Sequence, residues 1–180
     1  MASYNIKKNK HYSSFRLERL IPYVGRKTLK WKFCFDADCN YYKDVLEITD
    51  FKRATQLQTQ INKLCGVSFG MHHRNSIRIG WTASDQHNLI TLFVYWYDKG
   101  VRGQRELCNI IANKHYIVTM DMRLNDIVIK VDDNRNVYGT ETIQIKRKWF
   151  GYYLFPYFGG KEPAPHNMTV YLSRDEEIYD

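Results

Sequence analysis

The sequence predicts an all-β fold, a two-sheet antiparallel jelly-roll sandwich in which residues 1–180 form a single domain. Three observations support this prediction. The length of 180 residues suits one domain with a sizeable core. Apolar and polar residues alternate with a period of two from residue 66 onward, in short segments separated by turn residues about every 8 to 12 positions. The composition, 44% hydrophobic and 15% aromatic, excludes a disordered chain.

About ten short segments read as strands, and no stretch between them reads as a linker. The expected strands are residues 15–20, 29–35, 76–81, 89–97, 102–110, 116–124, 127–131, 140–145, 152–158 and 168–172. In residues 76–81, Ile77, Ile79 and Trp81 face one way and Arg78 the other, which indicates a half-buried strand. Residues 89–97 are apolar on almost both faces, so this segment is expected to be a central strand.

One segment departs from the period of two. Residues 50–64 lack Gly and Pro and place apolar side chains at helical intervals, at Phe51, Ala54, Leu57, Ile61 and Leu64. Either Thr49 or Asp50 could cap the first turn through a side-chain oxygen. A short helix is therefore predicted here.

The positive charge is concentrated at one end of the chain. Residues 1–32 hold nine basic residues against one acid, so they account for the whole formal net charge of +8. Such a segment attracts nucleic acid or an acidic protein surface, or it acts only as a solubilising arm. The residues predicted to bind a partner are Lys7, Lys8, Lys10, Arg16, Arg19, Arg26 and Lys27.

The sequence also indicates a location and a redox environment. The N-terminus has no apolar signal-peptide core, and no run approaches the roughly 18 apolar residues of a membrane span. The expectation is a cytoplasmic or virion-borne protein that binds no membrane and no cofactor. The four cysteines form no CxxC pair, which favours buried thiols in strands over disulfides or a metal cage. They are Cys34, Cys39, Cys65 and Cys108.

The sequence resembles two groups of known proteins, over different sets of residues. Residues 113–116 and 127–132, with Phe155-Pro156-Tyr157-Phe158-Gly159-Gly160 later, resemble the concanavalin A-like jelly roll of laminin-G-like and lectin-like domains. This resemblance implies a carbohydrate-binding fold over the C-terminal two-thirds of the chain. The block from Asn62 to Trp81 resembles uncharacterised proteins of bacteria and their tailed phages. That second resemblance implies a protein of bacteria or of their phages, and it implies no particular activity.

Enzymatic chemistry is not expected. A retaining glucanase needs two neighbouring carboxylates, whereas Glu106, Asp121 and Glu141 have no acidic partner two residues away. No phosphate-binding glycine loop or nucleophile elbow is present. A sandwich polysaccharide lyase needs only a cation and a His or Tyr base. Arg74, Arg78, His72, His73 and Tyr95 could serve, but the lyase strand motifs known to us are retained only in outline, at residues 157–160.

Metal binding is also not expected. His72 and His73 are adjacent, so in a strand they would point to opposite faces, and a turn is the simpler interpretation. Asp132, Asp133 and Asn134 cluster oxygens that Ca²⁺ could use, but their spacing is not that of an EF-hand loop, and an exposed hairpin tip is the simpler interpretation.

The leading functional hypothesis is a non-enzymatic component of a larger assembly such as a phage virion, docked to other proteins through the basic N-terminal segment. The alternative is a glycan-binding module, and a polysaccharide lyase ranks third. The residues predicted to bind glycan are Trp81, Tyr95, Tyr97, Arg74 and Arg78.

Overall fold

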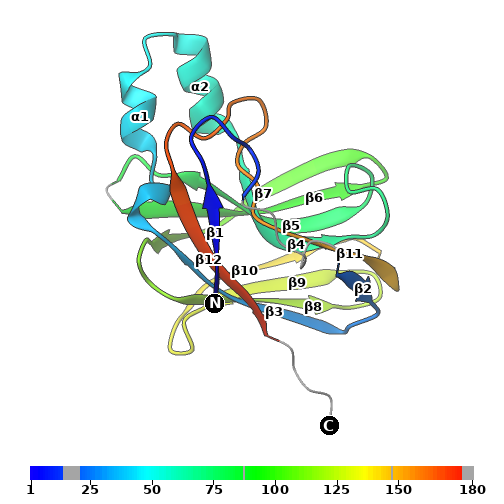
Figure 1. The fold of residues 1–180 in the computed structure, drawn as a ribbon. Helices are drawn as coiled ribbons and strands as arrows, with labels where there is room; N and C mark the ends of the chain where they lie inside the picture. Colours follow the sequence, from blue (N-terminus) through cyan, green and yellow to red (C-terminus); the bar gives the residue numbers. More distant parts are fainter. Residues whose placement is uncertain (14–20, 87, 147, 176–180) are drawn as a thin grey trace.

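Two six-stranded antiparallel sheets pack face to face in the computed structural model, which describes residues 1–13, 21–86, 88–146 and 148–175 (Figure 1). Sheet A has the strand order β1 (Ala2–Ile6), β12 (Met168–Asp175), β3 (Thr28–Phe35), β8 (Tyr116–Met122), β9 (Ile127–Asp132) and β10 (Val137–Ile143). Sheet B has the order β2 (Pro22–Val24), β11 (Phe150–Leu154), β4 (Asn62–Ser68), β5 (Ser76–Ala83), β6 (Leu89–Asp98) and β7 (Val101–Ile111). The predicted all-β jelly-roll sandwich is confirmed.

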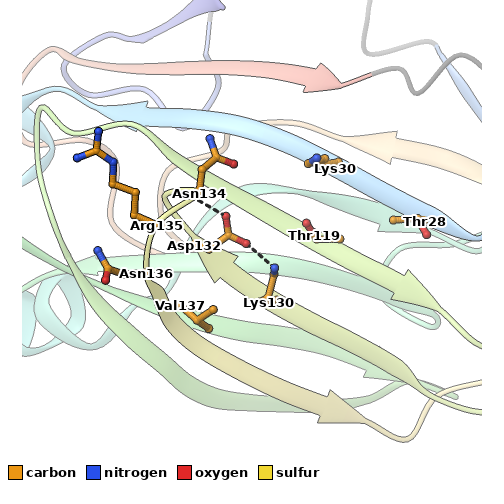
Figure 2. A pocket seen from close by; sticks show the side chains of 9 residues that line it. All are labelled: Thr28, Lys30, Thr119, Lys130, Asp132, Asn134, Arg135, Asn136 and Val137. Carbon is orange, nitrogen blue, oxygen red and sulfur yellow. Dashed lines mark hydrogen bonds and ion pairs between the residues drawn. The ribbon is translucent and has the colours of Figure 1, made fainter.

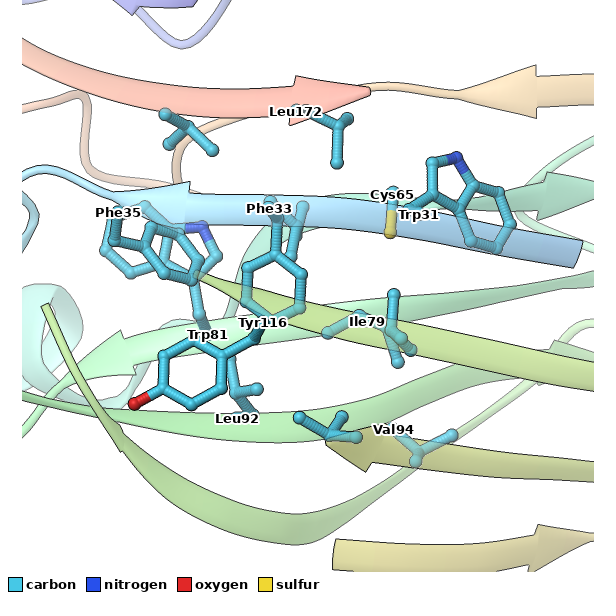
Figure 3. Close-up of a cluster of buried hydrophobic side chains, with 14 of the residues drawn as sticks. Trp31, Phe33, Phe35, Cys65, Ile79, Trp81, Leu92, Val94, Tyr116 and Leu172 are labelled. Atoms are coloured by element: carbon cyan, nitrogen blue, oxygen red, sulfur yellow. The ribbon is translucent and has the colours of Figure 1, made fainter. Parts of the chain in front are cut away.

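The core fills the space between the sheets because alternate residues of each strand point inward. Figure 3 shows Phe33 and Phe35 of sheet A facing Ile79 and Trp81 of sheet B. The Phe35 and Trp81 rings lie 5.0 Å apart, centroid to centroid. All four cysteines are free thiols, and Cys34, Cys39 and Cys65 are buried.

The helical prediction is partly correct. Helix α2 (Phe51–Thr59) begins as expected, with the Asp50 carboxylate accepting hydrogen bonds from the backbone N–H groups of Lys52 (2.9 Å) and Arg53 (3.2 Å). It ends five residues early, because residues 62–64 already belong to β4. A second helix, α1 (Tyr42–Glu47), precedes it, after a 3-10 turn at Ala37–Cys39, and was not predicted. No helix in the described ranges is both long and apolar enough to cross a membrane.

The basic N-terminal segment forms part of the sandwich. Strand β1 pairs with β12, strand β2 pairs with β11, and β3 lies inside sheet A. Tyr4, Tyr23 and Trp31 are buried in the core, so residues 1–32 are not a separate arm as far as they are described. Neither β1 nor β2 was predicted, and the strand expected over residues 15–20 lies outside the described residues.

Partner binding by the basic segment stays a prediction. Lys7, Lys8 and Lys10 are exposed just beyond β1, and Lys27 is exposed between β2 and β3, where Arg26 is half-buried. Arg16 and Arg19 lie outside the described residues. The strand expected at 152–158 also needs correction, because β11 covers only residues 150–154 and the chain then turns.

A basic, tyrosine-rich cleft on sheet B

A cleft of about 830 Å³ lies on the outward face of sheet B, the face turned away from the core. Polar and aromatic side chains from five strands and four loops line it: Tyr12, Gln60, Lys63, His72, His73, Arg78, Tyr95, Tyr97, Arg102, Gln104, Tyr152 and Tyr157. None of the described residues that line it is Asp or Glu. The described lining therefore carries three basic side chains, Lys63, Arg78 and Arg102, and no acidic one to balance them.

Strand register brings the floor of the cleft together. In antiparallel pairs, residues directly opposite each other point to the same face of the sheet. One such row crosses five strands through Leu154, Gly66, Arg78, Tyr95 and Gln104. A second row crosses them through Tyr152, Ser68, Ser76, Tyr97 and Arg102. Arg78 thus occupies the middle of the floor.

Two walls rise at opposite ends of these strands. The turn between β4 and β5 supplies His72 and His73. At the other end, the Tyr12 ring packs edge-on against Tyr157 at 5.1 Å, and Gln60 accepts hydrogen bonds from the backbone of residues 160 and 162. The second wall is therefore held by contacts between the end of α2 and the loop that follows β11.

Arg78 is the most unusual residue of the cleft. It is only 8% exposed, and its Nε and Nη2 atoms are buried with no hydrogen-bond partner among the described residues. Burial lowers the pKa of its guanidinium, and the nearby tyrosine hydroxyls of Tyr95 and Tyr152 oppose that shift. Gly66 lies opposite Arg78 on the neighbouring strand, where a β-carbon would collide with the Ile77 carbonyl oxygen and the Arg78 α-carbon. An unpaired buried charge is costly, and an anion hydrogen-bonded to Nε and Nη2 would offset that cost.

Lys63 adds a second cation at the base of one wall. Its ammonium donates to the carbonyl oxygens of Ile61 (2.6 Å) and Gly159 (3.1 Å) and lies 5.0 Å from the centroid of the Tyr95 ring. Burial, and then the positive charges of Arg78 and Arg102, lower the pKa of Lys63 to about 8. The cations of the cleft therefore repel one another.

Two hydrogen-bonded pairs complete the polar lining. The Tyr95 hydroxyl donates to the Tyr97 hydroxyl at 3.2 Å, and burial raises the pKa of Tyr95 to about 12. His72 Nδ1 lies 2.9 Å from the Tyr152 hydroxyl. Burial, and then the charge of Arg78, lower the pKa of His72 below its ordinary value. The lowered pKa favours the neutral form of His72, which has Tyr152 as its partner.

The structure places three of the five residues predicted to bind glycan in the cleft. Arg78, Tyr95 and Tyr97 are brought together in the cleft, and a role in glycan binding stays a prediction. Trp81 was wrongly included, because it is 0% exposed and lies among Phe35, Tyr41 and Phe158 in the core. Arg74 is exposed in the turn after His73 and is not among the lining residues.

Several cleft residues escaped sequence analysis. Lys63 was assigned to the helix, and Tyr152 and Tyr157 were read as parts of one strand. Arg102 and Gln104 are two residues apart in the predicted hairpin strand, so the sequence indicates that they share a face. Their position next to Arg78 depends on the register of three strands, which the sequence does not give.

The two carboxylates of the acidic hairpin tip already have partners within the chain. Figure 2 shows the Asp132 carboxylate paired with Lys130 at 2.8 Å and accepting the Asn134 backbone N–H at 3.1 Å. Asp133 pairs with Lys114 at 2.8 Å, and these hydrogen bonds hold its pKa well below the usual range. Within the described residues, no three His, Cys, Asp or Glu side chains gather as a metal site.

Comparison with known proteins supports the fold. No family model matches the chain, and no curated protein matches it. Among solved structures, an alginate lyase from Klebsiella pneumoniae aligns with a TM-score of 0.54 and 9% identity, over 82% of this chain and 59% of the lyase. The shared feature is the jelly-roll sandwich. A functionally unknown protein from Saccharomyces cerevisiae aligns with a TM-score of 0.56 and 9% identity, over 98% of this chain and 88% of the other.

Proposed function

We propose that this protein binds an acidic polysaccharide in the sheet B cleft, with Arg78 holding the carboxylate of a uronic acid residue. The observation that carries the proposal is the buried guanidinium of Arg78, which has two unpartnered nitrogens in a cleft without acidic side chains. The planar fork of an arginine matches the two oxygens of a carboxylate. Binding such an anion would satisfy both nitrogens and offset the cost of burying the charge.

The remaining lining favours a sugar as the carrier of that carboxylate. Tyrosine combines an apolar ring, on which a pyranose ring can pack, with a hydroxyl that exchanges hydrogen bonds with sugar hydroxyls. Tyr95, Tyr97 and Tyr152 surround Arg78, and Gln104 stands in the same row. The fold supports this proposal, because one of the aligned structures is a lyase named for alginate, an acidic polysaccharide.

Titration calorimetry with oligosaccharides of mannuronic or galacturonic acid tests the proposal. We expect Arg78→Met to weaken binding at least about tenfold, since a lost charge-assisted pair with a carboxylate costs about 1.5–3 kcal/mol. Arg74→Met is the matched control, because Arg74 is exposed in the adjacent turn and outside the cleft lining, and it should bind like the wild type. Equal binding by both variants would count against the proposal.

A second candidate function, cleavage of the same glycan by β-elimination, is favoured by the pairing of His72 with Tyr152 beside Arg78. Pairing of the uronate carboxylate with Arg78 would acidify the proton at C5. Neutral His72 would take that proton, and the C4–O bond would break as a C4=C5 double bond forms. The leaving oxygen would take up a proton from the Tyr152 hydroxyl. This elimination requires no oxidant and no cofactor.

Ultraviolet absorbance of the new double bond distinguishes the two functions. A lyase produces it with wild-type protein, and Tyr152→Phe removes it while oligosaccharide binding persists. If wild-type protein binds acidic oligosaccharides without any rise in absorbance, the protein is a binding module and the lyase candidate is rejected.

A further inference from the structure

The outward face of sheet B continues beyond the cleft, over the edge of the sheet formed by β11 and β2. Phe150 is opposite Val24, and Tyr152 is opposite Pro22. Because Tyr23 points into the core, Pro22 and Val24 on either side of it point outward, on the same face as Tyr152. We call Pro22, Val24 and Phe150 the apolar strip. It adjoins the cleft through Tyr152.

The apolar strip is exposed and held in place. Phe150 is 73% exposed and Val24 is 58% exposed, although both belong to a paired part of the sheet. The adjoining turn is fixed, because the Gly25 N–H donates to the Trp149 carbonyl oxygen at 2.7 Å. Gly25 also packs so closely against the Trp149 ring that a side chain at Gly25 would collide with it. Neighbouring exposed apolar side chains on a rigid strand pair often mark a binding surface.

We infer that the apolar strip is a further sugar-binding subsite and that the cleft therefore holds an internal stretch of a linear acidic polysaccharide. This inference rests on the proposed function. The occupant follows from continuity, because a chain lying over Arg78 and Tyr152 and continuing across the strands meets Phe150 and Val24 next.

Distance and chemistry define what the strip binds. Strand β11 is separated from β5 by β4, so Phe150 and Arg78 stand on strands about 10 Å apart at the usual spacing. That span exceeds one sugar ring, so a single monosaccharide cannot reach both sites. The strip itself contains no charged or hydrogen-bonding side chain, which suits the C–H face of a pyranose and leaves the carboxylate to Arg78.

A length series of oligosaccharides tests the inference. Calorimetry with oligomannuronates and oligogalacturonates, from disaccharides upward, should show wild-type affinity rising with length until the chain spans both sites. Phe150→Ala should remove at least about threefold of the gain for long oligosaccharides and leave disaccharide affinity unchanged. Phe51→Ala is the matched control, because Phe51 is 84% exposed at the start of α2 and is not among the residues that line the cleft.

The outcomes separate this inference from the proposed function. If disaccharides bind in an Arg78-dependent way but length and Phe150→Ala have no effect, the subsite is wrong and the cleft proposal stands. If no oligosaccharide binds, or Arg78→Met changes nothing, both fall. Sedimentation provides a further check. A wild-type dimer that Phe150→Ala converts to a monomer would identify the apolar strip as a self-association surface and overturn the inference.

Discussion

Arg78→Met is expected to stabilise the folded protein while it removes the anion site. The Nε and Nη2 atoms of Arg78 are buried without a hydrogen-bond partner among the described residues. Each buried polar group left unsatisfied costs about 1–3 kcal/mol. Methionine removes both groups, and its unbranched chain fills much of the same space.

After some loss of packing, the net gain should be about 2 kcal/mol in the free energy of unfolding. For a protein of this size, that corresponds to a rise of about 4–8 °C in melting temperature. Urea unfolding followed by circular dichroism, with thermal unfolding alongside, measures both quantities.

Arg74→Met changes an exposed side chain and should stay within about 0.5 kcal/mol of the wild type. Destabilisation by Arg78→Met would mean that Arg78 holds the fold together through its contacts with the surrounding tyrosines. Arg78 would then have a structural role, and the proposal that its guanidinium is held for an anionic ligand would be wrong.

Three further predictions concern Lys63, Trp81 and the thiols. The pKa of Lys63 is about 8 in the folded protein and about 10.4 when unfolded, so between these values the unfolded chain binds more protons. Urea unfolding of wild type and of Lys63→Met gives the difference between their free energies of unfolding at each pH. This difference, wild type minus variant, should rise across the window by up to about 1.4 kcal/mol per pH unit. A difference that does not change with pH would contradict the burial of Lys63. Trp81→Phe should lower the free energy of unfolding by about 1–3 kcal/mol, because it leaves a void in the core, yet calorimetry should show unchanged glycan affinity; weakened binding would place the ring in the cleft. Burial raises the pKa of every cysteine thiol, so Ellman's reagent at pH 8 should react slowly with native protein and with all four thiols after denaturation; rapid native labelling would show the core to be open.

Local alternation was enough to predict much of the fold and part of the site. It located β5 to β9 and β12 within a few residues, because each buries one face and repeats with a period of two. The same alternation placed Arg78 opposite Trp81, since an odd separation along a strand means opposite faces. Trp81 should therefore have been excluded from the glycan-binding set on sequence grounds alone.

The strands and cleft contacts that sequence analysis did not predict depend on pairing between distant segments of the chain. Strand β1 is stabilised by β12 at the other end of the chain, and its five residues give too short a pattern to stand out. His72 and Tyr152 meet although 80 residues separate them. Lys63 continued the helical pattern of α2, but Asn62 ties the chain into the sheet by bonding Tyr41 and Gly159. Strand register, which sequence periodicity does not define, assembles the cleft.

The most direct test of the central claim is a titration cycle that changes both partners of the proposed contact. Wild type and Arg78→Met are each titrated with an oligogalacturonate or oligomannuronate and with its neutral methyl ester. We predict that wild type prefers the free acid at least about tenfold and that Arg78→Met loses this preference, so the two changes are not additive. Retention of the full preference by Arg78→Met would show that the carboxylate is held elsewhere and would contradict the account.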